Sequence, residues 1–84
     1  MAVEHPHLHS VANQDGAAIL DIERGVLSTL NPTGAYVWQR FERGETIEAI
    51  VTALARETGE ELETVERDVR DFLEALNRKH DFDR

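Results

Sequence analysis

Histidines at the N-terminus are the first residues of this chain whose type and spacing could carry chemistry. His5, His7 and His9 alternate, so an extended backbone would place three imidazoles, which are good zinc ligands, on one side. No other histidine and no carboxylate at ligand spacing lies in this stretch. The pattern favours a polar strand face or an unstructured N-terminus over a metal site, and we expect no bound metal.

Carboxylates are the second group that could do chemistry, as acid–base pairs. Such a pair needs two environments that push the pKa values of its members apart. Here the acids alternate with Arg67 and Arg70, as on a solvated helix face. The chain also has no cysteine, no Gly-rich phosphate loop and no Ser/His/Asp spacing, so we predict neither an enzyme nor a cofactor. The pairs considered are Glu60/Glu61, Glu63/Glu66 and Asp68/Asp71.

Length and composition favour a small binding module. With 84 residues, 40% hydrophobic and 31% charged, residues 1–84 are expected to form a single domain with an ordered core at about 7–79. A core of this size leaves little material for a deep active site. No apolar run approaches the roughly 20 residues that span a bilayer, and the N-terminus is not a secretory signal. We therefore expect a cytoplasmic protein with no membrane partner.

The first third of the chain predicts a meander of short antiparallel strands joined by Gly-containing turns. In the last strand, Val26, Ser28 and Leu30 alternate with Leu27 and Thr29, so the two sets face opposite sides. The strands are expected over residues 7–12, 17–22 and 26–30.

Three helices are predicted after the strands. Asn31 and Pro32 indicate the start of a helix that runs to about residue 43, because asparagine caps helices and proline suits their first position. Thr46 is the expected cap of a second helix, and Gly59 its end. We expect residues 80–84 to form a frayed tail. The third helix is indicated by an apolar stripe at helical spacing, Leu62, Val65, Val69, Phe72, Leu73 and Leu76.

Together these elements predict an α+β fold of winged-helix-like type, with a three-stranded antiparallel sheet followed by three helices. That outline raises the class of DNA-binding regulators. The net charge of −8 disfavours it, because nucleic-acid affinity comes largely from Lys and Arg at phosphates. We expect no nucleic-acid partner and keep a winged-helix DNA-binding regulator as the weaker alternative.

The third strand has an edge without the usual protection. Residues 26–30 contain neither charge nor proline, which natural proteins use to block pairing at an edge. Such an edge beside an amphipathic helix suits the addition of a peptide strand. Cover by the N-terminus or by a second copy is the alternative reading.

Three motifs resemble the PqqD-like family, the peptide-recognition elements of ribosomal peptide biosynthesis. The resemblance covers about residues 7–82 and is closest to free-standing recognition proteins of lasso-peptide pathways, which accompany a separate leader protease. The carrier protein of pyrroloquinoline quinone synthesis is a sibling. The motifs are Asp15-Gly16…Leu20-Asp21…Gly25…Leu30-Asn31-Pro32-Thr33-Gly34-Ala35…Trp38, Gly44-x-Thr46-x-x-x-Ile50-Val51 and Asp68-Val69-x-x-Phe72-Leu73-x-x-Leu76.

The resemblance implies a non-catalytic function. The leader segment of a precursor peptide would bind as an extra antiparallel strand on the third strand, with side chains (often Tyr and Pro in lasso systems) in a cleft against the third helix. The protein would then deliver the precursor to a leader protease and a cyclase. A carrier for a radical enzyme in pyrroloquinoline quinone-type cofactor synthesis is the alternative.

The resemblance also implies which residues bind the peptide. Leu27 and Ser28 depart from the family, since relatives often carry aromatics there. Asp68 and Asp71 could attract a basic leader residue. The expected peptide-binding residues are Val26, Leu27, Ser28, Thr29 and Leu30 on the strand, and Asp68, Val69, Phe72 and Leu76 on the helix.

Overall fold

One antiparallel sheet and three helices make up the fold, as the sequence predicts. The computed structural model describes residues 7–80. The strands are β1 (Leu8–Asn13), β2 (Gly16–Asp21) and β3 (Val26–Leu30), paired in the order β1-β2-β3. Each strand lies within one residue of its predicted range. Because β2 is the central strand, β3 is an edge strand within the described part of the chain.

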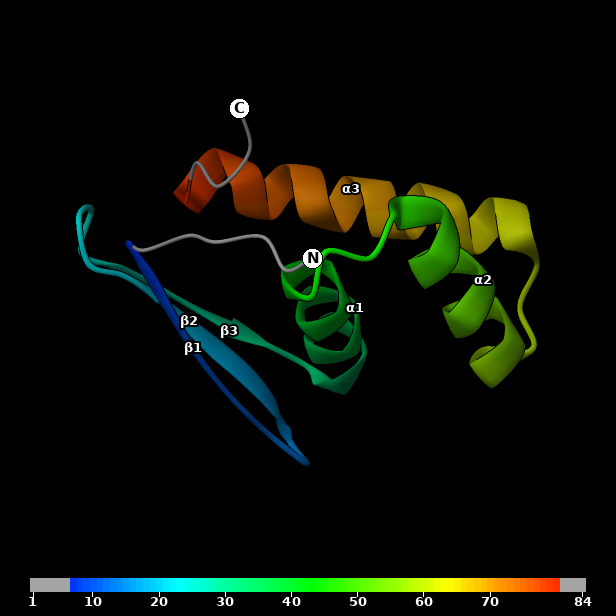
Figure 1. Cartoon of the computed structure of the whole chain (residues 1–84), viewed down its shortest axis with the longest axis horizontal. Helices are drawn as coiled ribbons and strands as arrows, with labels where there is room; N and C mark the ends of the chain where they lie inside the picture. Colours follow the sequence, from blue (N-terminus) through cyan, green and yellow to red (C-terminus); the bar gives the residue numbers. More distant parts are fainter. Residues whose placement is uncertain (1–6, 81–84) are drawn as a thin grey trace.

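The helices follow the sheet in the predicted order. They are α1 (Pro32–Glu42), α2 (Ile47–Thr58) and α3 (Leu62–His80). Figure 1 shows α1 between the sheet and α2, with α3 running alongside all of them. Within residues 7–80, no helix is both long and apolar enough to cross a membrane.

The predicted caps determine where these helices begin and end. The Asn31 side chain accepts a hydrogen bond from the Gly34 N–H (2.8 Å), and Thr46 accepts one from the Ala49 N–H (3.0 Å). Each bond satisfies a backbone donor that a helix N-terminus leaves without a partner. Gly59 closes α2 in the left-handed conformation, with φ of 75°. These local signals therefore act as the sequence predicts.

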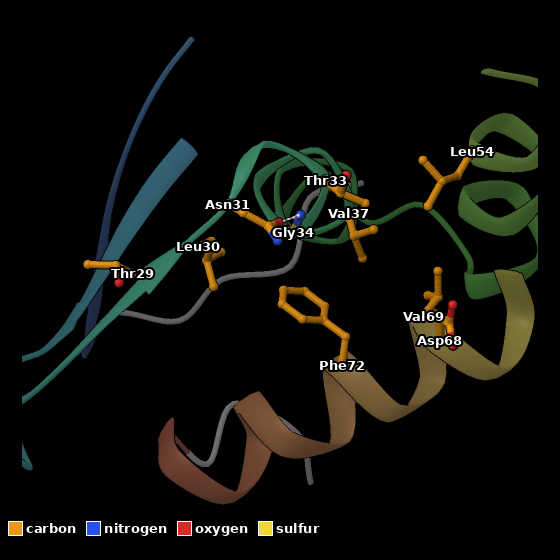
Figure 2. A pocket seen from close by; sticks show the side chains of 10 residues that line it. All are labelled: Thr29, Leu30, Asn31, Thr33, Gly34, Val37, Leu54, Asp68, Val69 and Phe72. Carbon is orange, nitrogen blue, oxygen red and sulfur yellow. Dashed lines mark hydrogen bonds between the residues drawn. The ribbon is translucent and has the colours of Figure 1, made fainter. Parts of the chain in front are cut away.

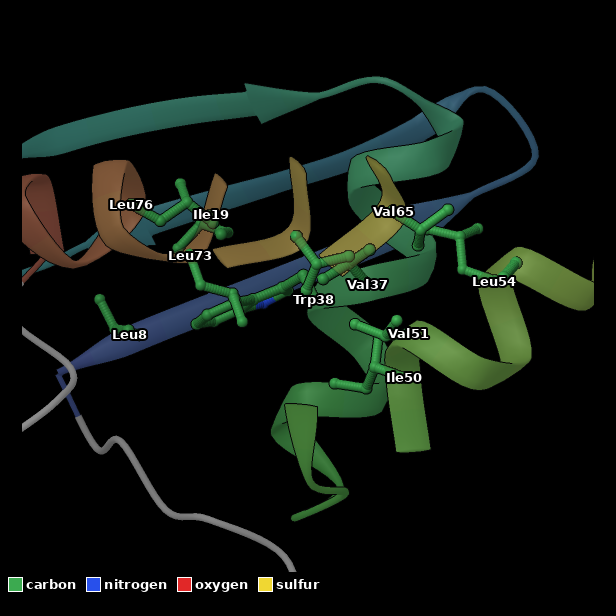
Figure 3. Packing of buried hydrophobic residues seen from close by; sticks show 12 residues of the cluster. Leu8, Ile19, Val37, Trp38, Ile50, Val51, Leu54, Val65, Leu73 and Leu76 are labelled. Carbon is green, nitrogen blue, oxygen red and sulfur yellow. The ribbon is translucent and has the colours of Figure 1, made fainter. Parts of the chain in front are cut away.

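The core lies between the inner face of the sheet and the helices. Trp38 is fully buried at its centre, and its indole N–H donates to Ser10 Oγ (2.9 Å) on β1. Ser10 in turn donates to a carboxylate oxygen of Glu42 (3.1 Å). Figure 3 shows side chains from β1, β2 and all three helices meeting in this cluster. The core covers one face of the sheet, and Val11 (70% exposed) and Leu27 (62% exposed) lie on the other.

The predicted frayed tail is wrong at its first residue. His80 is the last residue of α3 and is fully buried, together with Asp21 and Ser28. The apolar stripe of α3 therefore continues one turn beyond Leu76, with a histidine in the next inward position. The remainder of the expected tail lies outside the described residues.

Candidate functional site

A hollow opens between the end of β3, the start of α1 and α3. It encloses about 320 Å³ and has a mainly apolar lining. In Figure 2 the Phe72 ring rises from α3 toward Leu30 and the start of α1. Asp68 is the one charged residue among those that line it, within residues 7–80. The lining consists of Thr29, Leu30, Asn31, Thr33, Gly34, Val37, Leu54, Asp68, Val69 and Phe72.

A second hollow continues along β3 toward the C-terminal end of α3. It encloses about 370 Å³. Phe72 lines both hollows, as do Thr29 and Leu30. We call the two hollows together the β3–α3 groove. The lining of the second hollow is Leu27, Ser28, Thr29, Leu30, Phe72, Ala75, Leu76 and Lys79.

The structure brings most of the expected peptide-binding residues together at this groove. On β3, residues 27–30 line it, whereas Val26 lies at the start of the strand and lines neither hollow. On α3, Asp68, Val69, Phe72 and Leu76 line it. Asp71 does not, because it lines a separate hollow on the side of α3 that contacts α2 and the end of α1.

The apolar residues of α3 differ in how far they reach the groove. Val69 is 2% exposed and Leu76 is 5% exposed, so both belong mainly to the core and form the floor. Phe72 is half-buried and packs against the core from its edge. On β3, Ser28 points inward and Leu27 and Thr29 point outward, as their alternation predicts. Of Val69, Phe72 and Leu76, Phe72 is therefore the side chain most open to a ligand.

The outer edge of β3 gives the groove its backbone donors and acceptors. β3 pairs with β2 along its whole length, from Ala17↔Leu30 to Asp21↔Val26. No other strand of the described chain pairs with it. Because the backbone groups of a strand point alternately to its two sides, the N–H and C=O groups directed away from β2 are open to an added strand.

A buried polar cluster ties the C-terminal end of α3 to the sheet below the groove. The Ser28 hydroxyl and His80 Nε2 are hydrogen-bonded at 2.8 Å, and His80 Nδ1 lies 3.5 Å from Asp21 Oδ2. His7 donates from Nε2 to the carbonyl oxygen of His80 (3.0 Å). Burial by itself raises the pKa of the Asp21 carboxyl, but the hydrogen bond from the Arg24 backbone N–H, the nearby Arg24 guanidinium and the adjacent His80 ring outweigh it and hold that pKa below its ordinary value of 3.8.

This cluster has the residue types of a hydrolytic triad but not its exposure. Ser28 is 6% exposed and its hydroxyl faces His80 inside the protein, so it is not presented to a substrate. The arrangement fits a structural tie between β3 and α3. The role of His80 was not predictable from the residues near Ser28, because the two lie 52 positions apart in the sequence. Its i+4 spacing from Leu76, on the inward stripe of α3, is the signal that could have found it.

The N-terminal histidines do not form a common site among the described residues. His5 lies outside the described range, His7 bonds to the His80 carbonyl, and His9 is exposed on β1. Within residues 7–80, no group of three or more His, Asp or Glu side chains could hold a metal ion.

Comparisons with known proteins agree with this architecture. The sequence model of a family described as coenzyme PQQ synthesis protein D (PqqD) matches residues 16–80. The chain is similar to a solved structure of TbiB1 in complex with the TbiA(beta) leader peptide, with 34% identity and a TM-score of 0.84 over 94% of this chain and 91% of that one. It is also similar to a lasso peptide synthetase B1 complexed with the leader peptide, with 25% identity and a TM-score of 0.82 over 90% and 89%. The comparison with curated proteins finds no match.

Proposed function

The chain belongs to the PqqD family, and from this premise we propose that it binds the leader segment of a ribosomally made precursor peptide as an added strand on β3. The observation that carries the proposal is the open edge of β3 beside an apolar groove. Both similar solved structures are complexes with leader peptides, and each is covered over about nine-tenths of its length.

The groove suits an extended peptide. Backbone hydrogen bonds to β3 would supply affinity, and the hollows on either side of Phe72 would supply specificity. Side chains two residues apart in a strand share one face and lie about 7 Å apart. Two alternate side chains of the leader would therefore enter the groove while the intervening one points outward. A micromolar dissociation constant, about −8 kcal/mol, is within reach of such a contact.

The proposed role is recognition without catalysis, in the cytoplasm, with residues 1–84 acting as a single domain. The protein would hold the precursor for a separate leader protease and a cyclase of lasso-peptide biosynthesis. The similar lasso peptide synthetase B1 supports this pathway. The family description favours a second candidate, a carrier that presents a precursor peptide to a radical enzyme in cofactor synthesis. The two candidates share the groove and differ in the precursor.

A titration by fluorescence anisotropy tests the proposal. A labelled leader peptide, from a precursor encoded beside this protein, is titrated with wild type, Phe72→Glu and Leu62→Glu. Leu62 is the matched control, because it lies on α3 and is 57% exposed but lines neither hollow. We expect saturable binding that Phe72→Glu abolishes and Leu62→Glu retains, with both variants folded by circular dichroism. Equal binding by a folded Phe72→Glu variant would refute the site.

A further inference from the structure

The β3–α3 groove carries opposite charges at its two ends. Asp68 lines the hollow at the Leu30 end, and Lys79 lines the hollow at the Leu27 end. Among residues 7–80, these are the charged side chains of the two linings. The Asp68 side chain is 64% exposed, and its contact with Arg67 is loose, at 3.9 Å. A ligand in the groove therefore meets a carboxylate at one end and an ammonium group at the other.

Helix geometry places both charges on the same face of α3. Asp68 and Lys79 are eleven positions apart, which is about three helical turns, so they point in nearly the same direction. Phe72 and Ala75 lie between them on that face. The neighbouring charges Asp71 and Arg78 are rotated away. Asp71 lines the hollow on the α2 side, and Arg78 pairs with Glu74 at 3.5 Å.

The direction in which β3 runs determines which end of a bound peptide meets each charge. β3 runs from the Lys79 end of the groove to the Asp68 end, since Leu27 lines the hollow of Lys79 and Asn31 lines that of Asp68. An added antiparallel strand runs the opposite way, so its N-terminal part lies at Asp68 and its C-terminal part at Lys79. Eleven helical residues span about 16 Å, which an extended peptide covers in about five residues. Because side chains alternate between the two faces of a strand, both charged side chains face α3 only at an even spacing. A spacing of six residues, about 20 Å, also leaves two alternate side chains between the charges for the two hollows, and flexible charged side chains bridge the difference of a few ångströms.

We propose that the groove selects peptides with a basic residue six positions before an acidic one, and that Asp68 and Lys79 set the direction and register of the bound strand. This inference rests on the proposed strand addition and goes further, because it names the charge pattern of the ligand. Exposed charge pairs contribute roughly two- to fivefold each to an equilibrium constant, so the matched pattern gains about tenfold over the reversed one. Like charges at both ends of the reversed pattern widen that difference.

Two peptides of identical composition test this inference. Both keep the apolar residues of the leader; one carries Lys six positions before Glu, and the other has these two residues exchanged. Wild type is expected to bind the Lys-first peptide about tenfold more tightly at low salt, with a smaller preference at high salt. The double variant Asp68→Lys/Lys79→Glu is expected to prefer the Glu-first peptide.

The matched control is Asp71→Lys/Arg78→Glu. It makes the same charge changes on the same helix, at residues that line neither hollow of the groove. It carries a similar penalty from the helix dipole and is expected to keep the wild-type preference. Equal binding of both peptides to wild type, with Phe72→Glu still abolishing it, overturns the charge inference and leaves the proposed function intact. Absence of binding by either peptide to folded wild type overturns both. If the control variant prefers the Glu-first peptide, the peptide preference is not set by Asp68 and Lys79, and the inference is overturned.

Discussion

Gly34 lies where α1 meets the Phe72 ring. A substitution at this position is therefore expected to change the shape of the groove while leaving the stability of the fold nearly unchanged. A Cβ atom on residue 34 would lie 3.1 Å from two Phe72 ring atoms, Cε1 and Cζ, and 3.3 Å from the capping oxygen of Asn31. These distances are a few tenths of an ångström below ordinary contact. The half-buried ring can move toward the groove more easily than the cap can move. Gly34→Ala is therefore expected to push Phe72 into the hollow that a peptide side chain would fill.

The magnitudes predict a small effect on folding and a larger loss of binding. Alanine is favoured over glycine inside a helix by roughly 0.5–1 kcal/mol, which offsets a mild overpacking cost of about 1 kcal/mol. The free energy of unfolding is then expected to change by less than about 1 kcal/mol. Leader affinity is expected to fall about tenfold, or ~1.4 kcal/mol, because the ring takes space from the ligand.

Urea unfolding and anisotropy titration measure these two quantities on the same variant. A second substitution, Phe72→Leu in the Gly34→Ala background, removes the displaced ring edge and is expected to recover part of the affinity. The reasoning fails if Gly34→Ala binds leader like wild type. It also fails if the variant loses several kcal/mol of stability, since the Asn31 cap and not the ring would then have absorbed the clash.

Three further predictions concern the elements that hold the groove. Gly16 has φ of +143°, and a Cβ there would overlap the Leu30 carbonyl oxygen, so Gly16→Ala is expected to destabilise the fold by more than about 3 kcal/mol in urea unfolding. Leu27→Pro is expected to weaken leader binding at least tenfold in the anisotropy titration, whereas Leu27→Thr, which keeps the edge N–H, retains most of it. The lowered pKa of Asp21 contributes stability that is complete above pH 3.8 and is lost as pH falls through the folded value. The gap in unfolding free energy between wild type and Asp21→Asn is therefore expected to narrow on acidification, and a constant gap would contradict the assignment.

The secondary structure could be predicted from the sequence because its signals are local. Asn31 followed by Pro32, Thr46 and Gly59 each act on backbone groups within a few residues, so their effect does not depend on distant packing. The alternation around Ser28 likewise follows from the strand period of two residues. The lack of charge and proline on β3 indicated an open edge, whereas a cleft beside that edge was implied by the family resemblance alone.

Tertiary packing decided which side chains of α3 reach the groove. Asp68 and Asp71 are equivalent in the sequence pattern and lie only about 60° apart around the helix, yet Asp68 lines the groove and Asp71 lines the hollow beside α2. The apolar stripe of α3 is wide enough to serve both core and cleft. Only the approach of β3 and α1 leaves Phe72 half-buried while Val69 is covered.

The burial of His80 depended on contacts between distant parts of the chain. Its environment comes from Ser28 and Asp21, which are more than fifty positions away in the sequence. The sequence by itself determined the strands, the helices and their ends, because short-range hydrogen bonding and side-chain periodicity suffice for these. The tertiary structure alone decided the charge order of the groove and the polar tie beneath it, because both arise where elements remote in sequence pack together.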